Sequence, residues 1–159
     1  MKAEYILRII FVGILITFFL FSVFLVGIYS SYIKYFGINI FYNPFFAQSF
    51  NVYIFVALSL FFGIGFFLPY INKIIKIVYI LALLGSMTML IPSVGNSVGM
   101  MLLSKKDKVL IENKEVVVKV LYDDGFYKVY LNPNAKDLDT LEKRKENLVY
   151  FEIPKEAKN

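Results

Sequence analysis

The sequence predicts an α+β membrane protein, in which three transmembrane helices precede a small antiparallel domain with the order β-β-β-α-β. Residues 1–103 contain three apolar runs, at about 9–28, 52–71 and 77–103, and no run contains a charged residue. Each run is long enough for the roughly 20 residues that cross a bilayer as a helix. In residues 104–159 apolar and polar side chains alternate instead, which indicates half-buried strands in a small soluble α+β domain.

Composition limits the chemistry that we expect. The chain is 58% hydrophobic, with 17 Phe and 12 Tyr, and it contains no Cys, His or Trp. Without Cys it has no disulfide framework and no thiolate metal site, and without His it lacks the usual proton-transfer group near neutral pH. We therefore expect no catalytic residues, no cofactor and no metal, and a protein that is not an enzyme. The net charge is +4 in residues 1–103 and +1 in residues 104–159, so no basic stripe for nucleic acid is present.

The first run, Ile9–Ile28, is longer than the apolar part of a usual signal peptide, and we interpret it as an uncleaved helix. The connector that follows, Tyr29–Asn51, holds five Phe and four Tyr but only one charged residue. Aromatic rings favour the membrane–water interface, so the sequence predicts an interfacial segment, broken by Gly37 and by Asn43-Pro44. It either lies on lipid headgroups or contacts a partner. The interfacial contact candidates are Tyr35, Phe36, Phe41, Tyr42, Phe45 and Phe46.

The second run, Val52–Ile71, and the third, Ile77–Leu103, are joined by the short segment Asn72–Lys76 and should form a helical hairpin. The third run changes character at Pro92, where small and polar residues begin, including a GxxxG pair at Gly95 and Gly99. Such residues let helices approach closely in lipid. They indicate a helix contact within the chain, a homo-oligomer seam, or a broken helix that lines a pore. The helix-packing or pore-lining candidates are Gly85, Ser86, Pro92, Ser93, Gly95, Asn96 and Gly99.

Basic residues favour the cytoplasmic side of a membrane. Three spans place four basic residues on one side: Lys2, Arg8, Lys73 and Lys76. This predicts a multi-pass protein of a bacterial cytoplasmic (inner) membrane, with a cytoplasmic N-terminus and a periplasmic or extracellular C-terminal domain. A competing signal comes from lysines that directly follow the third run: Lys105, Lys106 and Lys108. If residues 92–103 are re-entrant, or if the first run does not span, the domain lies in the cytoplasm instead.

In the C-terminal domain the pattern predicts four strands and a helix. The expected elements are strands Val109–Glu112, Glu115–Tyr122, Phe126–Leu131 and Leu148–Ile153, and a helix Ala135–Glu146 that Asn134 would cap. Alternation places Val118, Val120 and Tyr122 on one face of the second strand. We interpret Asp123-Asp124-Gly125 as a solvated turn rather than an acid–base pair, and Lys143-Arg144-Lys145 as a solvated helix end.

The layout of membrane spans before a small β-domain resembles two families. Gly95 and Gly99, followed by Asp124-Gly125 and Pro133-Asn134, are similar to features of small-conductance mechanosensitive channels. NfeD-like membrane proteins also carry a C-terminal β-barrel. This chain is shorter and has fewer strands than the channels, and it lacks a match to the NfeD glycines, so the sequence assigns neither family.

The function that we expect from the sequence is an assembly or accessory subunit of a membrane complex, with a β-domain that binds a partner. The alternative is a small homo-oligomeric channel or transport component built on the third helix. A third hypothesis is a lipid-modifying enzyme that uses Asp123, Asp124 or Tyr42 at the interface. The expected partners are membrane lipid and either another membrane protein or further copies of this chain, and no nucleic acid.

Overall fold

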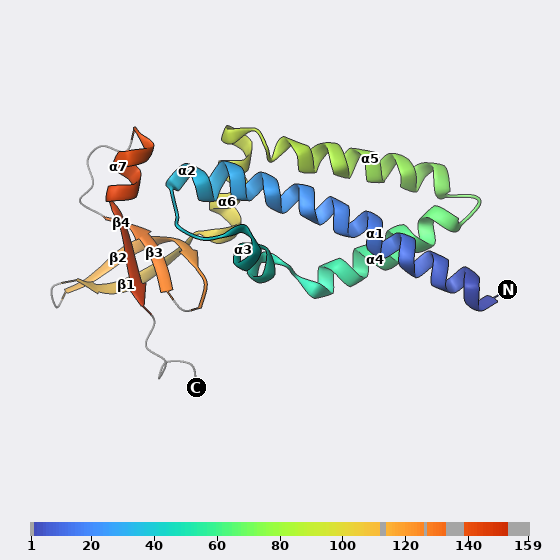
Figure 1. Cartoon of the computed structure of the whole chain (residues 1–159), viewed down its shortest axis with the longest axis horizontal. Helices are drawn as coiled ribbons and strands as arrows, with labels where there is room; N and C mark the ends of the chain where they lie inside the picture. Colours follow the sequence, from blue (N-terminus) through green and yellow to red (C-terminus); the bar gives the residue numbers. More distant parts are fainter. Residues whose placement is uncertain (1, 112–113, 126, 133–138, 153–159) are drawn as a thin grey trace.

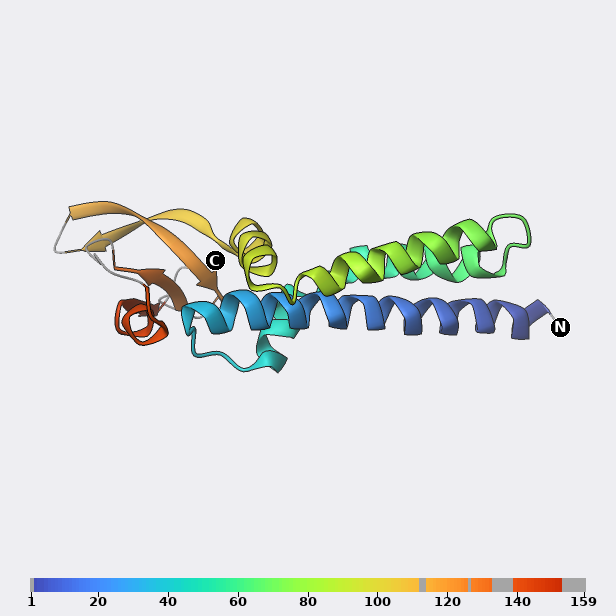
Figure 2. The same cartoon turned by 90° about the horizontal axis from the view of Figure 1, so that it is seen from above.

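The computed structural model shows a bundle of helices with a small four-stranded antiparallel sheet at one end (Figure 1). The structure describes residues 2–111, 114–125, 127–132 and 139–152. The N-terminus lies at the end of the bundle that is far from the sheet (Figures 1 and 2). The mixed helical and antiparallel architecture predicted from the sequence is confirmed.

One long helix runs the length of the bundle and reaches the sheet. Helix α1 (Lys2–Ile28) continues without a break through the π-helix η1 (Tyr29–Ile33) and α2 (Lys34–Phe36). Residues 3–36 form the one described helix that is long and apolar enough to cross a membrane, and its 34 residues span roughly 51 Å. The prediction of a connector from Tyr29 onward is therefore wrong for its first eight residues. The helix ends only at Gly37, whose φ of 73° is left-handed.

Helices α4 (Val52–Phe67) and α5 (Asn72–Thr88) pack beside α1 as an antiparallel pair. The turn between them is 68–71 and not the predicted Asn72–Lys76, because Asn72 already begins α5. Small residues spaced by four let α1 and α4 meet closely: a Cβ built on Gly13 would lie 2.1 Å from the Ser59 carbonyl oxygen, and one on Gly63 would lie 2.6 Å from the Ile9 carbonyl oxygen. The sequence gives no sign of this contact, because Gly13 and Gly63 stand in different apolar runs and no local pattern pairs them.

The third apolar run is two helices and not one. Helix α5 ends at Thr88, and α6 (Pro92–Leu103) starts after a bend of 95°. Pro92 occupies the first turn of α6, where its missing N–H leaves no hydrogen bond unmade, so the proline starts a helix rather than kinking one. The helix-packing or pore-lining candidates, predicted to lie along one helix, are thus divided between two helices that point in different directions.

Helix α3 (Tyr42–Ser49) bends away from α4 by 76° in the same manner. If each bent pair is counted as one span, the described residues contain up to three candidate membrane spans. Figure 2 shows α6 and α3 on either side of the long helix, close to its sheet end. Asn43 and Pro44, which were expected to break helical structure, lie in the first turn of α3.

The sheet is formed by β1 (Lys105–Ile111), β2 (Lys114–Asp123), β3 (Tyr127–Leu131) and β4 (Leu148–Glu152), paired in that order and all antiparallel. Helix α7 (Leu141–Glu146) precedes β4, so the predicted order β-β-β-α-β is confirmed. Strand β1 begins four residues before the predicted Val109. The cap of α7 is Thr140, whose Oγ1 accepts from the Lys143 N–H at 3.3 Å. The predicted cap Asn134 and residues 135–138 lie outside the described residues.

A β-bulge redirects the end of β2 toward the helices. The β2–β3 register shifts between Val120 and Tyr122, which leaves Leu121 without an opposite residue on β3. Val120 packs on one face with Val118, while Leu121 and Tyr122 both join the core that faces the helices. The prediction that Tyr122 shares a face with Val120 is therefore wrong, because the extra residue reverses the alternation.

Candidate functional site

The described residues concentrate their buried polar contacts where the helices meet the sheet, a region that we call the junction. Its core contains apolar side chains of the long helix, α3 and three strands. The fully buried members are Ile28, Tyr32, Ile33, Phe45, Leu121, Tyr122 and Val129. Tyr32 donates its hydroxyl proton to the Leu121 carbonyl oxygen at 2.9 Å, so the bulge of β2 is bonded directly to η1. The sheet is thereby fixed to the long helix.

Gln48 of α3 forms a second bridge to the sheet. The Tyr122 hydroxyl donates to Gln48 Oε1 at 2.5 Å, and Gln48 Nε2 donates to the Asp124 carbonyl oxygen at 2.5 Å. Burial raises the pKa of Tyr122, so its hydroxyl stays protonated and able to donate. Sequence reasoning missed Gln48, since an isolated polar residue in an aromatic segment gives no pattern that identifies its partner.

The two aspartates after β2 hold a turn. Asp123 Oδ1 accepts from the Gly125 N–H at 2.9 Å, and Asp124 Oδ1 accepts from the Tyr127 N–H at 2.7 Å. Gly125 has a φ of 77°, a left-handed conformation that favours glycine. Both carboxylates thus bond to backbone N–H groups of their own turn, as the turn interpretation expects, and this geometry gives no support to an acid–base pair.

Arg144 of α7 docks onto the end of the long helix. Its side chain is only 9% exposed, and its guanidinium carbon lies 4.0 Å from the centre of the Tyr35 ring. The Arg144 Nε–H donates to the Tyr35 carbonyl oxygen at 2.9 Å, and Nη1 donates to the Asp139 carbonyl oxygen at 3.2 Å. The prediction of a solvated basic helix end is therefore wrong for Arg144, whereas Lys143 and Lys145 on either side are exposed.

The structure brings some of the predicted helix-packing candidates together and leaves others apart. Gly95 and Gly99 lie against η1, where added Cβ atoms would come within 2.5 Å of Ser31 Cβ and Tyr32 Cβ. Ser31 Oγ donates to the Met89 carbonyl oxygen at 2.8 Å at the same corner. Gly85, in contrast, faces open space. The two glycines of the GxxxG pair thus form a helix contact within the chain.

The remaining candidates of the third run do not gather into one site. Ser86 is buried and donates its hydroxyl proton to the Ala82 carbonyl oxygen of its own helix at 2.9 Å. Pro92 and Ser93 are exposed. Asn96 Oδ1 is buried and has no hydrogen-bond partner among the residues that the structure describes.

The aromatic candidates divide into buried and exposed groups. Phe36 and Phe45 are 5% and 0% exposed and belong to the junction core, with the Phe45 ring centre 6.3 Å from that of Tyr122. Tyr42 and Phe46 are partly buried against this core. Tyr35 lies under Arg144, while Phe41 is 81% exposed. Five of the six residues predicted to contact lipid or a partner therefore contact other parts of the chain, and two of these five, Phe36 and Phe45, are buried.

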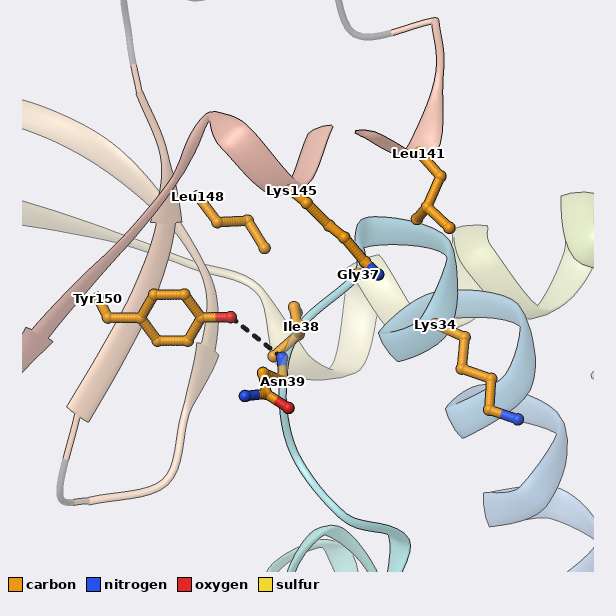
Figure 3. A pocket seen from close by; sticks show the side chains of 8 residues that line it. All are labelled: Lys34, Gly37, Ile38, Asn39, Leu141, Lys145, Leu148 and Tyr150. Atoms are coloured by element: carbon orange, nitrogen blue, oxygen red, sulfur yellow. Dashed lines mark hydrogen bonds between the residues drawn. The ribbon is translucent and has the colours of Figure 1, made fainter. Parts of the chain in front are cut away.

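Two cavities open beside the junction. The lysine groove, of about 580 Å³, lies between α2, α7 and β4 (Figure 3). Its described lining consists of Lys34, Gly37, Ile38, Asn39, Leu141, Lys145, Leu148 and Tyr150. The apolar groove, of about 290 Å³, lies between α1, α3, the end of α6 and β2, with Phe24, Leu102 and Tyr122 in its wall. The sequence pattern gave no sign of either, because each combines residues from segments far apart in the chain.

The side chains around the junction offer hydrogen bonds and positive charge. No group of three or more Asp, Glu, His or Cys that could hold a metal ion occurs among the described residues. The lysine groove offers donors, and the apolar groove offers a hydrophobic wall with a few polar atoms. Comparison of the chain with protein-family models, with curated proteins and with solved structures found no match.

Proposed function

We propose that this protein is an integral membrane protein in which α1 and the two bent pairs, α3 with α4 and α5 with α6, each make one span, with α3 and α6 at one surface of the bilayer. The exposed large apolar side chains on α1, α4 and α5 support this. They include Phe11, Leu15, Phe19, Leu60, Phe61, Ile64, Ile77 and Leu81, each at least 47% exposed. Many exposed large apolar side chains on three packed helices are unfavourable in water and suit contact with lipid tails.

The proposed orientation follows from where the charges lie along the bundle. Lys73 stands at the start of α5, beside the turn at the N-terminal end of the bundle, and the sheet lies at the other end (Figure 1). The positive-inside rule then places the N-terminus and this turn in the cytoplasm of a bacterium and the sheet outside the inner membrane. The competing Lys105 and Lys106 belong to strand β1, so they are part of the folded sheet.

We further propose that the protein is a non-enzymatic accessory or assembly subunit whose sheet binds a membrane-protein partner. The observation that carries this proposal is the rigid attachment of the sheet. Only Ser104 separates α6 from β1, and the bond from Tyr32 to Leu121 holds the sheet to the long helix. A fixed sheet presents a defined surface at a set height above the bilayer. The channel alternative draws no support from Gly95 and Gly99, because both contact η1 within the chain.

Cysteine labelling tests the membrane arrangement. The native chain contains no Cys, so Lys73→Cys and Lys119→Cys each create a unique target at an exposed position. A membrane-impermeant thiol reagent added to intact cells should label Lys119→Cys and label Lys73→Cys only after lysis. Labelling of both variants from the same side would contradict three spans, and release of the protein by alkaline carbonate would contradict integral insertion.

Photo-crosslinking tests the partner. A photoreactive amino acid at Val117, which is 62% exposed on β2, should give a discrete crosslinked protein in native membranes. The matched control is Tyr70, which is 94% exposed at the opposite end of the bundle. Absence of a protein adduct at Val117 and at Phe151, which is 43% exposed, under conditions in which the reagent reacts, would count against a partner-binding sheet.

A further inference from the structure

The lysine groove is built by segments that meet only in the folded chain. Lys34 comes from α2, Asn39 from the loop that follows Gly37, Lys145 from α7 and Tyr150 from β4. Figure 3 shows the Lys145 side chain reaching over Gly37. A Cβ on Gly37 would lie 2.3 Å from Lys145 Cγ, so the absence of a side chain at this position lets the lysine stem cross the chain.

Each polar side chain of the groove carries at least one hydrogen-bond donor. The Asn39 backbone N–H donates to the Tyr150 hydroxyl oxygen at 3.0 Å, and the proton of that hydroxyl has no acceptor among the described residues. Lys34 lies with its Nζ 5.7 Å from the centre of the Tyr29 ring. No carboxylate belongs to the described lining. The Lys145 ammonium, a side-chain amide and a phenol therefore border one space without a described acidic residue to neutralise them, whereas Lys34 stands at the rim with its Nζ directed away from that space (Figure 3).

A groove that offers hydrogen-bond donors and positive charge, and no carboxylate in its described lining, favours binding of an anion. We propose that the lysine groove binds the phosphate group of an anionic phospholipid headgroup. Lysine is a common phosphate binder because its ammonium is a compact point charge with three donors. The groove volume of about 580 Å³ exceeds that of a single phosphate, and Leu141 and Leu148 add apolar wall for the rest of the headgroup.

The choice of a lipid as the source of the phosphate rests on the proposed membrane function. The groove borders α2, at the sheet end of the long helix, and that end also carries the two bent helices α3 and α6 (Figure 1). If these helices mark the bilayer surface, the groove lies just beyond it, near the headgroups. A soluble phosphate ester would meet the same donors, so the test compares both sources.

The experiment uses the full chain purified in a nonionic detergent. Binding is measured for dihexanoyl phosphatidylglycerol, dihexanoyl phosphatidylcholine, glycerol 1-phosphate and inorganic phosphate. We expect the anionic lipid to bind more tightly than the other three probes. Removal of one Lys⁺–phosphate contact weakens binding by about fivefold, so Lys145→Gln should show this loss. Lys34→Gln, at the rim, should show a smaller loss, and the double variant a loss of more than about fivefold and less than about thirtyfold. The matched control is Lys119→Gln, an exposed lysine of β2 outside the groove.

The outcomes separate the ligand from the membrane arrangement. Equal affinity for the two lipids, or an unchanged affinity in the double variant, would overturn the groove as an anion site. Tighter binding of glycerol 1-phosphate than of the anionic lipid, lost in the double variant, would keep the phosphate site but overturn the lipid source. The double variant should still be retained in carbonate-washed membranes, so failure of lipid binding with normal retention would refute this inference and leave the proposed membrane function intact.

Discussion

Removing a single oxygen atom from Tyr32 tests whether the sheet is held to the long helix by specific bonds. Tyr32 is fully buried, and its hydroxyl donates to the Leu121 carbonyl oxygen at 2.9 Å across 89 residues of sequence. Tyr32→Phe keeps the ring packing against Phe36 but takes away the donor from a buried carbonyl. Such a loss costs about 1 to 3 kcal/mol. For a chain of this size it lowers the midpoint of thermal unfolding by roughly 3 to 10 °C.

The assay is thermal unfolding of the purified protein in detergent, followed by circular dichroism, with limited proteolysis of the sheet as a second readout. Tyr70→Phe is the control, because Tyr70 is 94% exposed and removal of its hydroxyl should leave the midpoint unchanged. If Tyr32→Phe unfolds at the wild-type temperature and resists protease as well as wild type, the sheet is not held through this bond and the rigid junction is refuted.

Three further substitutions test other parts of the structure. Gly95→Ala forces a Cβ to within 2.1 Å of a carbonyl oxygen and should destabilise by about 1 to 3 kcal/mol in thermal unfolding, whereas Gly85→Ala, which meets open space, should be neutral or stabilising by up to about 1 kcal/mol. Arg144→Lys loses the planar stack and a bond to a backbone carbonyl, so amide hydrogen exchange in α7 should accelerate. The hydrogen bond from Lys128 holds the pKa of Asp107 below its ordinary value of 3.8. The stabilisation from this pair is therefore present above pH 3.8 and lost as the pH falls below it, and Asp107→Asn should remove that acid-dependent part of the unfolding midpoint.

The length of the apolar runs and the alternation of apolar and polar residues predicted most of the helices and strands. The three runs became helices, and the order of strands and helix after residue 104 agrees with the structure. The residues at which helices begin and end were less predictable, because the effect of a proline or glycine on a helix depends on what surrounds it in the folded chain. Pro92 begins α6 rather than kinking α5, since the bend between the two helices, at Met89, packs against Gly27 and Ser31 of the long helix. No local pattern encodes contacts over such separations.

The junction was hidden from sequence reasoning for related reasons. Leu121 and Tyr122 are both apolar, so their alternation with Val120 gives no sign that a bulge turns both toward the helices. Arg144 stands in a run of charges and resembles a solvated residue, but its hydrogen-bond partner Tyr35 is 109 positions away. Nothing in the sequence around Gly13 or Ser59 shows that these residues contact each other, because the contact exists only where α1 packs against α4.

The unbroken course of the long helix gives the sheet a mechanical relation to the rest of the molecule. Residues 3–36 form one helix of roughly 51 Å, and the sheet is attached to its C-terminal end, so a rotation of the helix moves the sheet with it. A tilt of about 10° around its N-terminal end displaces the far end by about 9 Å, as far as the width of a helix. In the proposed membrane arrangement, tilting of this helix to match bilayer thickness would in this way convert a change in the lipid environment into a change in the position of the sheet.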